Sequence, residues 1–415
     1  MPRVLVVGAG VGGLTAALAL HRSGLNVRVV EAASCVAPIG VGLNILPNAV
    51  RELAALGLLD KLAESAVATK QLAFYNRYGD LIWQEPRGLD AGYRWPQFSI
   101  HRGDLVRVLL DAVRARLGAD AVITGARLAS HTDGPNGPVV ARLAHPDGRR
   151  TTLEADVLVG ADGIHSTVRA ALYPDEGPPP WNGLVMWRGT TWGQPFLTGS
   201  SMIVTGDDVR RVVLYPVRRD PASGRVLINW VAAAPSTTVP DAAPSPRKRV
   251  PVSAAMAEFG DWRFPWLDIG GVLAATKEVF EYPMLDRDPL SRWSVGRTTL
   301  LGDAAHPMYP AGSNGATQAV VDACALADAL SQHSPATAAL AEYERIRRPV
   351  TTEIQTSNRR MGPEVVITMA HQRAPNGFTD IDEVISPAEL AGISARYAST
   401  GRFDIDTVNS KGCAS

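Results

Sequence analysis

Short apolar runs alternate with glycine-rich turns at the start of the chain. Residues 4–7 form a continuous apolar run, an Ala- and Leu-rich stretch covers residues 14–23, and a second apolar run covers residues 27–30. Apolar runs of this length indicate buried strands, and an Ala- and Leu-rich stretch that ends at a glycine indicates a helix. The pattern therefore predicts a strand, a helix and a second strand, an order typical of a parallel sheet in an α/β domain.

The pattern changes between Pro180 and Arg287, where β-rich runs follow one another without a long helical period. Several of these runs alternate apolar and polar residues, which favours a mostly antiparallel sheet in a second domain. The connection at 232–252 is rich in Pro, Ser and basic residues, so we expect it on the surface. From Pro335 a helix is predicted that ends before Pro349, because proline lacks a backbone N–H. The β-rich runs cover residues 184–191, 202–205, 211–217 and 226–232.

The first glycine turn has the spacing of a dinucleotide-binding fingerprint. Residues 8–13 read Gly-Ala-Gly-Val-Gly-Gly and follow the first strand directly, and Glu31 follows the second. Gly8 allows the tight turn, Gly10 lets the backbone approach a pyrophosphate, and Gly13 lets the helix pack closely on the strand. A carboxylate at Glu31 accepts ribose hydroxyls and repels a 2′-phosphate, so we expect the tight ligand to be NAD-like or FAD-like.

Two later strands also run into turns that carry an acid. Asp162-Gly163 follows the apolar run at 157–159, and Gly302-Asp303 follows the run at 298–301. At the carboxyl ends of parallel strands, such acids lie where doubly wound sheets bind ligands and can accept hydrogen bonds from ribitol or ribose hydroxyls. Taken alone, Asp162 could instead be an ordinary helix N-cap.

The composition excludes several classes of function. The chain has 41 Lys and Arg against 41 Asp and Glu, so we expect neither a nucleic acid nor a membrane as partner. Its 415 residues, 46% of them hydrophobic, suffice for two or three domains. The uncharged stretch 4–20 is interrupted by four glycines and is short for a membrane span of ~20 residues. With Cys35, Cys324 and Cys413 scattered outside any disulfide or metal pattern, we expect a cytoplasmic protein without a metal site.

In this order, the glycine turn and the two acid-bearing segments resemble the class A flavoprotein aromatic hydroxylases, which have the para-hydroxybenzoate hydroxylase fold. The resemblance covers roughly residues 1–350. It implies an α/β fold with a Rossmann-like FAD-binding domain built from a discontinuous chain, a β-rich substrate domain and a C-terminal helical segment. The implied parts are 1–72, 98–180 and 287–350 for the FAD-binding domain, 73–97 and 181–286 for the substrate domain, and 351–415 for the helical segment.

The resemblance also assigns roles along the length of FAD. The glycine turn and Glu31 bind the ADP half, and Asp303 holds the ribitol chain. Asp162-Gly163 lies near the pyrophosphate and is associated with the nicotinamide cofactor as well. Arg102 is similar to a residue that reaches FAD from the start of a helix. The cofactor-binding residues expected on these grounds are Gly8, Gly10, Gly13, Glu31, Gly42, Arg102, Asp162, Gly163, Gly302, Asp303, Gly312, Ser313 and Asn314.

A second glycine-rich turn, residues 312–315, precedes an Ala-rich stretch at 316–330. Its backbone N–H groups and the helix dipole would stabilise the negative charge of a reduced flavin. Alternatively, this glycine-rich turn only begins a helix and binds no ligand. The turn departs from the Gly-Gln-Gly form common in the family and is similar to the phenazine and salicylate hydroxylase branch, above all to phenazine-carboxylate monooxygenases. The residues expected to border the flavin ring are Pro310, Gly312, Asn314 and Gly315.

The resemblance implies a single-component, FAD-dependent monooxygenase. Tightly and non-covalently bound FAD would be reduced by NADH or NADPH, react with O2 to a C4a-hydroperoxide and hydroxylate an aromatic or fused heteroaromatic small molecule, in one variant with loss of a carboxylate. The chain has one dinucleotide fingerprint and no CxxC pair, so the nicotinamide is expected to visit and leave. The alternatives are an epoxidase or reductase of the same fold acting on an alkene, and a protein that carries FAD without turnover. NADH against NADPH, and monomer against homodimer, stay open.

Substrate contacts are expected from aromatic and polar residues of the β-rich domain. Arg188 could bind a substrate carboxylate through both terminal nitrogens, although a surface or interdomain salt bridge is at least as well supported. Aromatic residues on sheets are also more often core than site. His306 beside Asp303 could act as a base towards a phenol, but a structural hydrogen bond is favoured. The substrate residues expected are Trp187, Arg188, Tyr215, Trp230 and Tyr282, with Arg188 and Tyr215 also as catalytic candidates.

Overall fold

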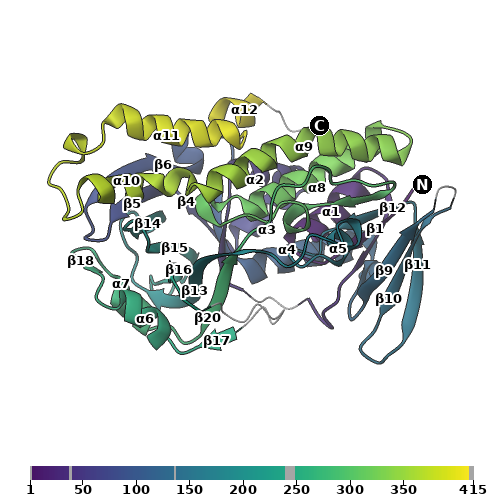
Figure 1. Cartoon of the computed structure of the whole chain (residues 1–415), viewed down its shortest axis with the longest axis horizontal. Coiled ribbons are helices and arrows are strands. Elements are labelled where there is room, and N and C mark those ends of the chain that lie inside the picture. Colours follow the sequence, from purple (N-terminus) through teal and green to yellow (C-terminus); the bar gives the residue numbers. More distant parts are fainter. Residues whose placement is uncertain (1, 37–39, 135–136, 239–247, 411–415) are drawn as a thin grey trace.

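A computed structural model describes residues 2–36, 40–134, 137–238 and 248–410. One part of the structure, assembled from separate stretches of the chain, is built on a five-stranded parallel sheet with the order β21-β12-β1-β2-β8 (Figure 1). Helix α1 packs on this sheet between α4 and α8. Its sequence is rich in Ala and Leu, and nearly all of its side chains are buried there. The elements of this part are β1 (Arg3–Val7), α1 (Val11–Arg22), β2 (Asn26–Val30), α4 (Arg102–Leu117), β8 (Val122–Ile123), β12 (Val157–Gly160), α5 (Thr167–Leu172), β21 (Thr298–Leu300) and α8 (Gly315–Gln332).

A second, eight-stranded sheet has the order β17-β20-β13-β16-β15-β14-β5-β6. All its neighbours are antiparallel except β14 and β5, which are parallel. One face is covered by two short helices, α6 (Ser253–Phe259) and α7 (Ile269–Ala274), which the sequence pattern did not predict (Figure 1). The strands are β5 (Gln71–Asn76), β6 (Leu81–Pro86), β13 (Trp181–Gly193), β14 (Ser201–Gly206), β15 (Arg211–Arg219), β16 (Val226–Pro235), β17 (Lys248–Val250) and β20 (Val279–Leu285).

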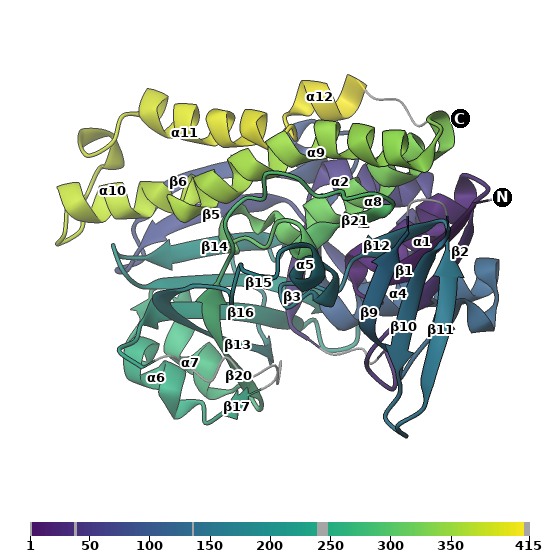
Figure 2. The ribbon, with the colours of Figure 1, turned by 45° about the vertical axis from the view of Figure 1, so that its right-hand side comes forward.

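Smaller elements connect the two large sheets. A three-stranded sheet of order β3-β7-β4 contacts β15 of the eight-stranded sheet and the helices α4 and α8 of the parallel-sheet part. A separate antiparallel sheet, β11-β10-β9, projects beside the parallel sheet (Figure 2). The bounds are β3 (Gly42–Ile45), α2 (Pro47–Ala55), α3 (Leu59–Ala63), β4 (Ala66–Thr69), β7 (Gln97–His101), β9 (Arg127–Asp133), β10 (Val139–Ala144), β11 (Arg150–Ala155), β18 (Arg263–Phe264) and β19 (Leu267–Asp268). Short 3₁₀ helices are η1 (Gly88–Ala91), η2 (Ala119–Ala121), η3 (Gly302–Ala304), η4 (Ala311–Ser313), η5 (Gly362–Glu364) and η6 (Ile381–Glu383).

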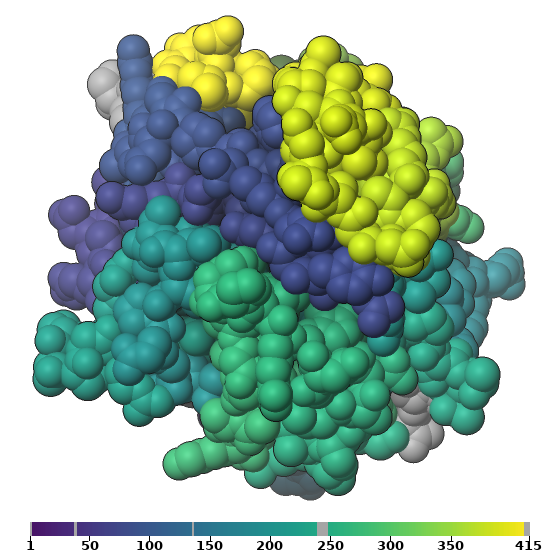
Figure 3. Space-filling model, turned by 90° about the vertical axis from the view of Figure 1, so that its left-hand side faces the viewer, coloured from purple at the N-terminus to yellow at the C-terminus, as the bar shows by residue number. Residues whose placement is uncertain are grey.

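The C-terminal helices lie across both large sheets (Figure 2). Helix α10 packs on β5 and β6, and Figure 3 shows the C-terminal helices lying against this part of the chain. Residues 351–410 therefore belong to the same body as the sheets. The helices are α9 (Ala336–Arg359), α10 (Val365–Arg373), α11 (Pro387–Thr400) and α12 (Ile405–Ser410).

The predicted end of a helix before Pro349 is wrong, because α9 continues through this residue to Arg359. Proline leaves one carbonyl without its intrahelical donor, that of Arg345. Arg345 is exposed, so water can take the place of the missing N–H. The buried residues Val350 and Ile354 continue the apolar face of α9 beyond the proline, and their packing outweighs the lost hydrogen bond.

The fold confirms the predicted class: an α/β protein with a discontinuous nucleotide-binding part, a largely antiparallel sheet and C-terminal helices. Cys35 is exposed and Cys324 is buried. Cys413 and residues 239–247 of the predicted surface connection lie outside the described residues. Within the described ranges, no helix is both long and apolar enough to span a membrane.

Candidate active site

One large cavity separates the parallel sheet from the eight-stranded sheet. Its volume is about 1050 Å³, at the upper end of the usual range for ligand pockets of ~300–1000 Å³. One wall contains the start of α1, Glu31, Arg102, Asp303 and the start of α8. The opposite wall is the face of the eight-stranded sheet that α6 and α7 leave free. A single space therefore joins the predicted cofactor residues to the predicted substrate domain.

The first glycine turn is shaped for close approach of a ligand. Gly8 has φ +106°, and a Cβ there would lie 2.4 Å from the carbonyl oxygen of Ala161. A Cβ at Gly13 would lie 1.9 Å from the carbonyl oxygen of Gly8, whereas one at Gly10 would meet no atom within 4 Å. No side chain caps the N-terminus of α1. Its first N–H groups are therefore left for an anion such as a pyrophosphate.

Glu31 holds the same turn from the end of β2. Its carboxylate accepts the N–H of Ala9 at 2.8 Å and the N–H of Ala33 at 2.8 Å. Each carboxylate oxygen can accept a further hydrogen bond, and the side chain lines the cavity. The residue thus fits the expected role at the ribose hydroxyls while it also fixes the turn.

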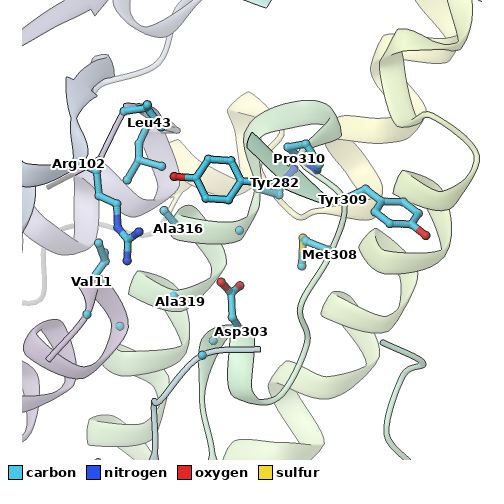
Figure 4. A pocket seen from close by; sticks show the side chains of 18 of the residues that line it. Val11, Leu43, Arg102, Tyr282, Asp303, Met308, Tyr309, Pro310, Ala316 and Ala319 are labelled. Atoms are coloured by element: carbon cyan, nitrogen blue, oxygen red, sulfur yellow. The ribbon is translucent and has the colours of Figure 1, made fainter. Parts of the chain in front are cut away.

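Asp303 follows β21, and its carboxylate points into the cavity opposite Arg102 (Figure 4). The side chain is accessible within the cavity, yet protein encloses it. Burial raises the pKa of this carboxyl, while electrostatic interactions with His306 and Arg102 act in the opposite direction. In the described part of the chain, no side-chain or backbone donor binds it. A carboxylate with free acceptor capacity at this position fits the hydroxyls of a ribitol chain.

The second glycine turn, in η4 and the start of α8, borders the same cavity. Gly312 has φ +66° and Ser313 has φ +59°. Helix α8 begins at Gly315 without a side-chain cap, so its first-turn N–H groups have no side-chain partner. Residues 313–316 form this part of the cavity wall. Burial raises the pKa of the nearby Glu364 carboxyl, and the backbone of Gly312 acts in the opposite direction. Ser313, Asn314 and Gly315 line the cavity and Gly312 does not, so the prediction that this turn offers N–H groups to the flavin now rests on its later residues and on the helix start.

The C-terminal segment supports this turn, which the sequence did not predict. Asn314 Nδ2 donates to the hydroxyl of Tyr397 at 2.9 Å. The Tyr397 hydroxyl lies 2.8 Å from Asn358 Oδ1 and 3.1 Å from the carbonyl oxygen of Ala311. A Cβ at Gly312 would lie 2.1 Å from that hydroxyl. Helix α11 thus holds the turn from behind, over a sequence separation that no local pattern reveals.

Asp162 acts both as a cavity residue and as a helix cap. Its carboxylate accepts the Ser166 hydroxyl at 2.5 Å and the N–H of Thr167 at 2.7 Å, at the start of α5. Burial raises the pKa of this carboxyl, and these hydrogen bonds oppose the shift. Gly163, with φ +79°, also lines the cavity. Arg169 of the same segment is buried behind the site, where it donates to the carbonyl oxygen of Ala305 at 2.9 Å.

Three predicted substrate residues lie on the cavity face of the eight-stranded sheet: Arg188, Tyr215 and Tyr282. Arg188 is half-buried in the cavity wall and donates to the carbonyl oxygen of Gly42 at 3.1 Å. Burial lowers its pKa, and the neighbouring Tyr215 opposes this shift. Burial raises the pKa of Tyr215 to about 12, so its hydroxyl stays protonated. Figure 4 shows the Tyr282 ring projecting into the cavity between Leu43 and Pro310.

The expectation that Trp187 and Trp230 contact substrate is wrong. Side chains alternate along a strand, and these two point away from the cavity into the core under α6 and α7. Trp187 Nε1 donates to Glu281 at 3.1 Å, and Trp230 Nε1 donates to Thr276 Oγ1 at 2.8 Å. Alternation from Arg188 would have identified Met186 as its neighbour on the cavity face. The cavity is in fact rich in residues that the sequence analysis missed: Met186, Met202, Phe280, Met284, Met308 and Met361.

His306 has the structural role that was favoured for it. The ring is buried, and its Nε2 lies 2.5 Å from Asp322 Oδ2. Arg347 Nε donates to the other oxygen of Asp322 at 2.7 Å. Burial alone would raise the pKa of Asp322, but the charges of His306 and Arg347 outweigh it and lower the pKa. The histidine therefore anchors α8 and α9 behind Asp303.

Comparison with known proteins agrees with this geometry. A family described as an FAD binding domain matches residues 1–182 and 274–357. The phenazine 1,6-dicarboxylic acid hydroxylase of Lysobacter antibioticus is 46% identical over 366 residues, covering 86% of this chain and 89% of that protein. The 3-amino-4-hydroxybenzoate 2-monooxygenase of Streptomyces cremeus is 33% identical over 411 residues, covering 95% of each. HpxO of Klebsiella pneumoniae, crystallised with FAD and uric acid, has a TM-score of 0.75 at 24% identity and covers 98% of this chain and 96% of its own.

The matched segments contain the glycine turn, Glu31, Arg102, Asp162 and Asp303. Residues 183–273, which the family match leaves out, supply most of the opposite wall. The comparisons confirm the family resemblance that the sequence motifs indicated. The chain therefore belongs to the class A flavin monooxygenases and is an FAD-dependent monooxygenase.

Proposed function

We propose that this enzyme inserts one oxygen atom of O2 into an aromatic or fused heteroaromatic small molecule at the expense of NADH or NADPH. The observation that carries the proposal is the cavity that joins the FAD-binding elements to an apolar sheet face containing Arg188. The 46% identity to a protein named a phenazine 1,6-dicarboxylic acid hydroxylase supports the choice of substrate class.

The residues of the first wall suit FAD along its whole length. The N-terminus of α1 would hold the pyrophosphate, Glu31 the ribose and Asp303 the ribitol chain, all without a covalent bond. Bound FAD supplies the redox chemistry, since it accepts a hydride and activates O2. The first-turn N–H groups of α8 would stabilise negative charge on the reduced ring. Gly42 and Arg102 complete this wall from the neighbouring elements.

The second wall suits a flat aromatic substrate. Phe280, Tyr282, Met186 and Met284 form an apolar slot that keeps water from the reacting atoms. Arg188 lies in this slot and contacts no carboxylate among the described residues. A substrate carboxylate would supply the missing counter-charge through a bidentate pair. If the carbon that bears this carboxylate is attacked, the reaction releases CO2; if another carbon is attacked, the acid is retained.

The nicotinamide cofactor is proposed to bind transiently. The chain has one dinucleotide fingerprint, and FAD accounts for it. NADH or NADPH would then reach the same cavity from solvent and leave after hydride transfer. Comparing the rates of NADH and NADPH oxidation by the purified enzyme distinguishes the two.

Labelled oxygen tests the reaction. The purified protein should be yellow, and an aromatic acid or phenazine should stimulate NAD(P)H oxidation and O2 uptake. Turnover under 18O2 should give a product that carries one labelled atom per molecule. A product labelled only from water would contradict the proposal, label in an alkene epoxide would favour the epoxidase alternative, and bound flavin without any turnover would favour a carrier.

Arg188→Lys tests the proposed carboxylate contact. A lysine ammonium cannot reproduce the forked pair, so the apparent affinity for an aromatic acid should fall at least tenfold with FAD content unchanged. Arg263→Lys is a matched control, because Arg263 is an exposed residue far from the cavity lining. Equal affinity of Arg188→Lys and the control for the acid would remove Arg188 from the substrate site.

A further inference from the structure

A second arginine, Arg211, lines the cavity on the same sheet face as Arg188 and is buried. We propose that the substrate is an aromatic diacid, with one carboxylate bound by Arg188 and the other by Arg211. This inference rests on the proposed function and specifies its substrate class. The sequence analysis did not single out Arg211.

Arg211 is buried and has N–H donors without a hydrogen-bond partner. Its terminal nitrogens donate to the carbonyl oxygen of Arg210 at 3.0 Å and to Thr368 Oγ1 at 2.6 Å. Both acceptors are neutral. Its Nε has no partner, and no carboxylate lies within salt-bridge distance of it in the described part of the chain. A guanidinium has five N–H donors and stays charged, so burying it without an anion in contact is costly unless a ligand supplies one.

The strand register places the two arginines at opposite corners of one apolar patch. Arg188 on β13 pairs with Val231 on β16, and Val231 pairs with Val213 on β15. Arg211 lies two residues before Val213 and pairs with Ala233. Two strand spacings across and two residues along separate the Cα atoms of Arg188 and Arg211 by roughly 12 Å. The side chains between them on this face are Met186, Val213, Val231 and Ala233, which form a flat, apolar floor suited to a fused ring.

Acidic groups near Arg211 offer an alternative explanation. Glu364 is buried close enough to interact electrostatically with Arg211, and Asp208 lies further out, 3.5 Å from His371. Burial raises the pKa of Glu364, which disfavours its negative charge beside the cavity. Asp207 is held by Arg210 at 2.9 Å. If Arg211 only joins the sheet to the C-terminal segment through Thr368 and Glu364, its replacement would destabilise the protein without changing which acid binds.

Binding of a matched pair of acids separates the two explanations. The probes are phenazine-1,6-dicarboxylate and phenazine-1-carboxylate, titrated into the FAD-loaded enzyme and followed by the flavin absorbance and by calorimetry. The wild type should prefer the diacid. Arg211→Met should weaken the diacid at least tenfold and the monoacid less than threefold.

Controls keep the test decisive. Arg249→Met removes an exposed arginine from the far edge of the same sheet and should bind both acids like the wild type. If Arg211→Met loses FAD or folds poorly, Arg211→Lys replaces it, and the diacid preference should still fall because the fork is lost. A wild type that binds neither acid, or has no preference for the diacid, overturns the inference, as does an equal loss of both acids in Arg211→Met.

The two proposals fail separately. Selective diacid binding without 18O incorporation would leave the second carboxylate site standing and remove the proposed hydroxylation. Oxygen insertion into a monoacid, with no preference for the diacid, would support the proposed hydroxylation and remove the second carboxylate site.

Discussion

Asp303 provides the sharpest test of the cofactor site, because its loss should have opposite effects on the apo and FAD-bound forms. Its carboxylate faces the cavity and has no hydrogen-bond donor in the described residues, and desolvation by the surrounding protein raises its pKa. Asp303→Asn keeps the shape of the side chain and removes the charge. We therefore expect the apoprotein to become more stable while the affinity for FAD falls.

The size of the FAD effect follows from the kind of contact that is lost. A hydrogen bond to a charged group contributes ~1.5–3 kcal/mol, so the Kd for FAD should rise about tenfold to a hundredfold. The stability effect should depend on pH. The folded-state pKa of Asp303 lies above its unfolded value, so both states are protonated at low pH and the wild type and Asp303→Asn should then match. The stability advantage of Asp303→Asn should open as the pH rises above the unfolded-state pKa and should be complete once the pH exceeds the raised folded-state pKa.

The measurements are FAD titration by fluorescence quenching and urea unfolding of the apoprotein across pH 4–8. Asp261→Asn serves as the control, because Asp261 is an exposed aspartate away from the cavity lining. Full FAD affinity in Asp303→Asn would refute the ribitol contact. A less stable apoprotein at pH 8 would refute the view that this carboxylate is buried at a cost.

Three further changes test other parts of the site. Glu31→Gln should weaken FAD binding less than Asp303→Asn does, since ribose contacts lie at the solvent end of the cofactor. It should also lower the melting temperature, because the charged Glu31 carboxylate accepts two backbone N–H groups. A flavin affinity equal to that of the wild type would contradict this. Tyr397→Phe should raise the fraction of NADH electrons released as peroxide, with FAD retained, because Asn314 loses a partner; unchanged coupling would remove the supporting role of α11. His306→Asn should lower the unfolding free energy by about 1.5–3 kcal/mol through the loss of its contact with Asp322, with the pH profile of turnover unchanged; a shifted profile would point to a base instead.

The sequence by itself determined the local parts of the FAD site. A strand, a glycine turn and a helix follow one another within a few residues, and steric limits at Gly8 and Gly13 leave one way to connect them. The acid of Gly302-Asp303 is likewise fixed to the end of its strand by its immediate neighbours. Short-range geometry of this kind can be read from the order of residues.

Only the tertiary structure decided which side chains meet the substrate. Alternation along β13 separates Arg188 from Trp187, but which face borders the cavity depends on α6 and α7 covering the other one. The roles of Tyr397, Glu364 and Arg211 depend on contacts between segments far apart in the chain. The continuation of α9 through Pro349 has the same origin, since packing of its apolar face outweighs a local preference. Side-chain alternation shows that a strand has two faces, and packing between distant segments determines which face borders the cavity.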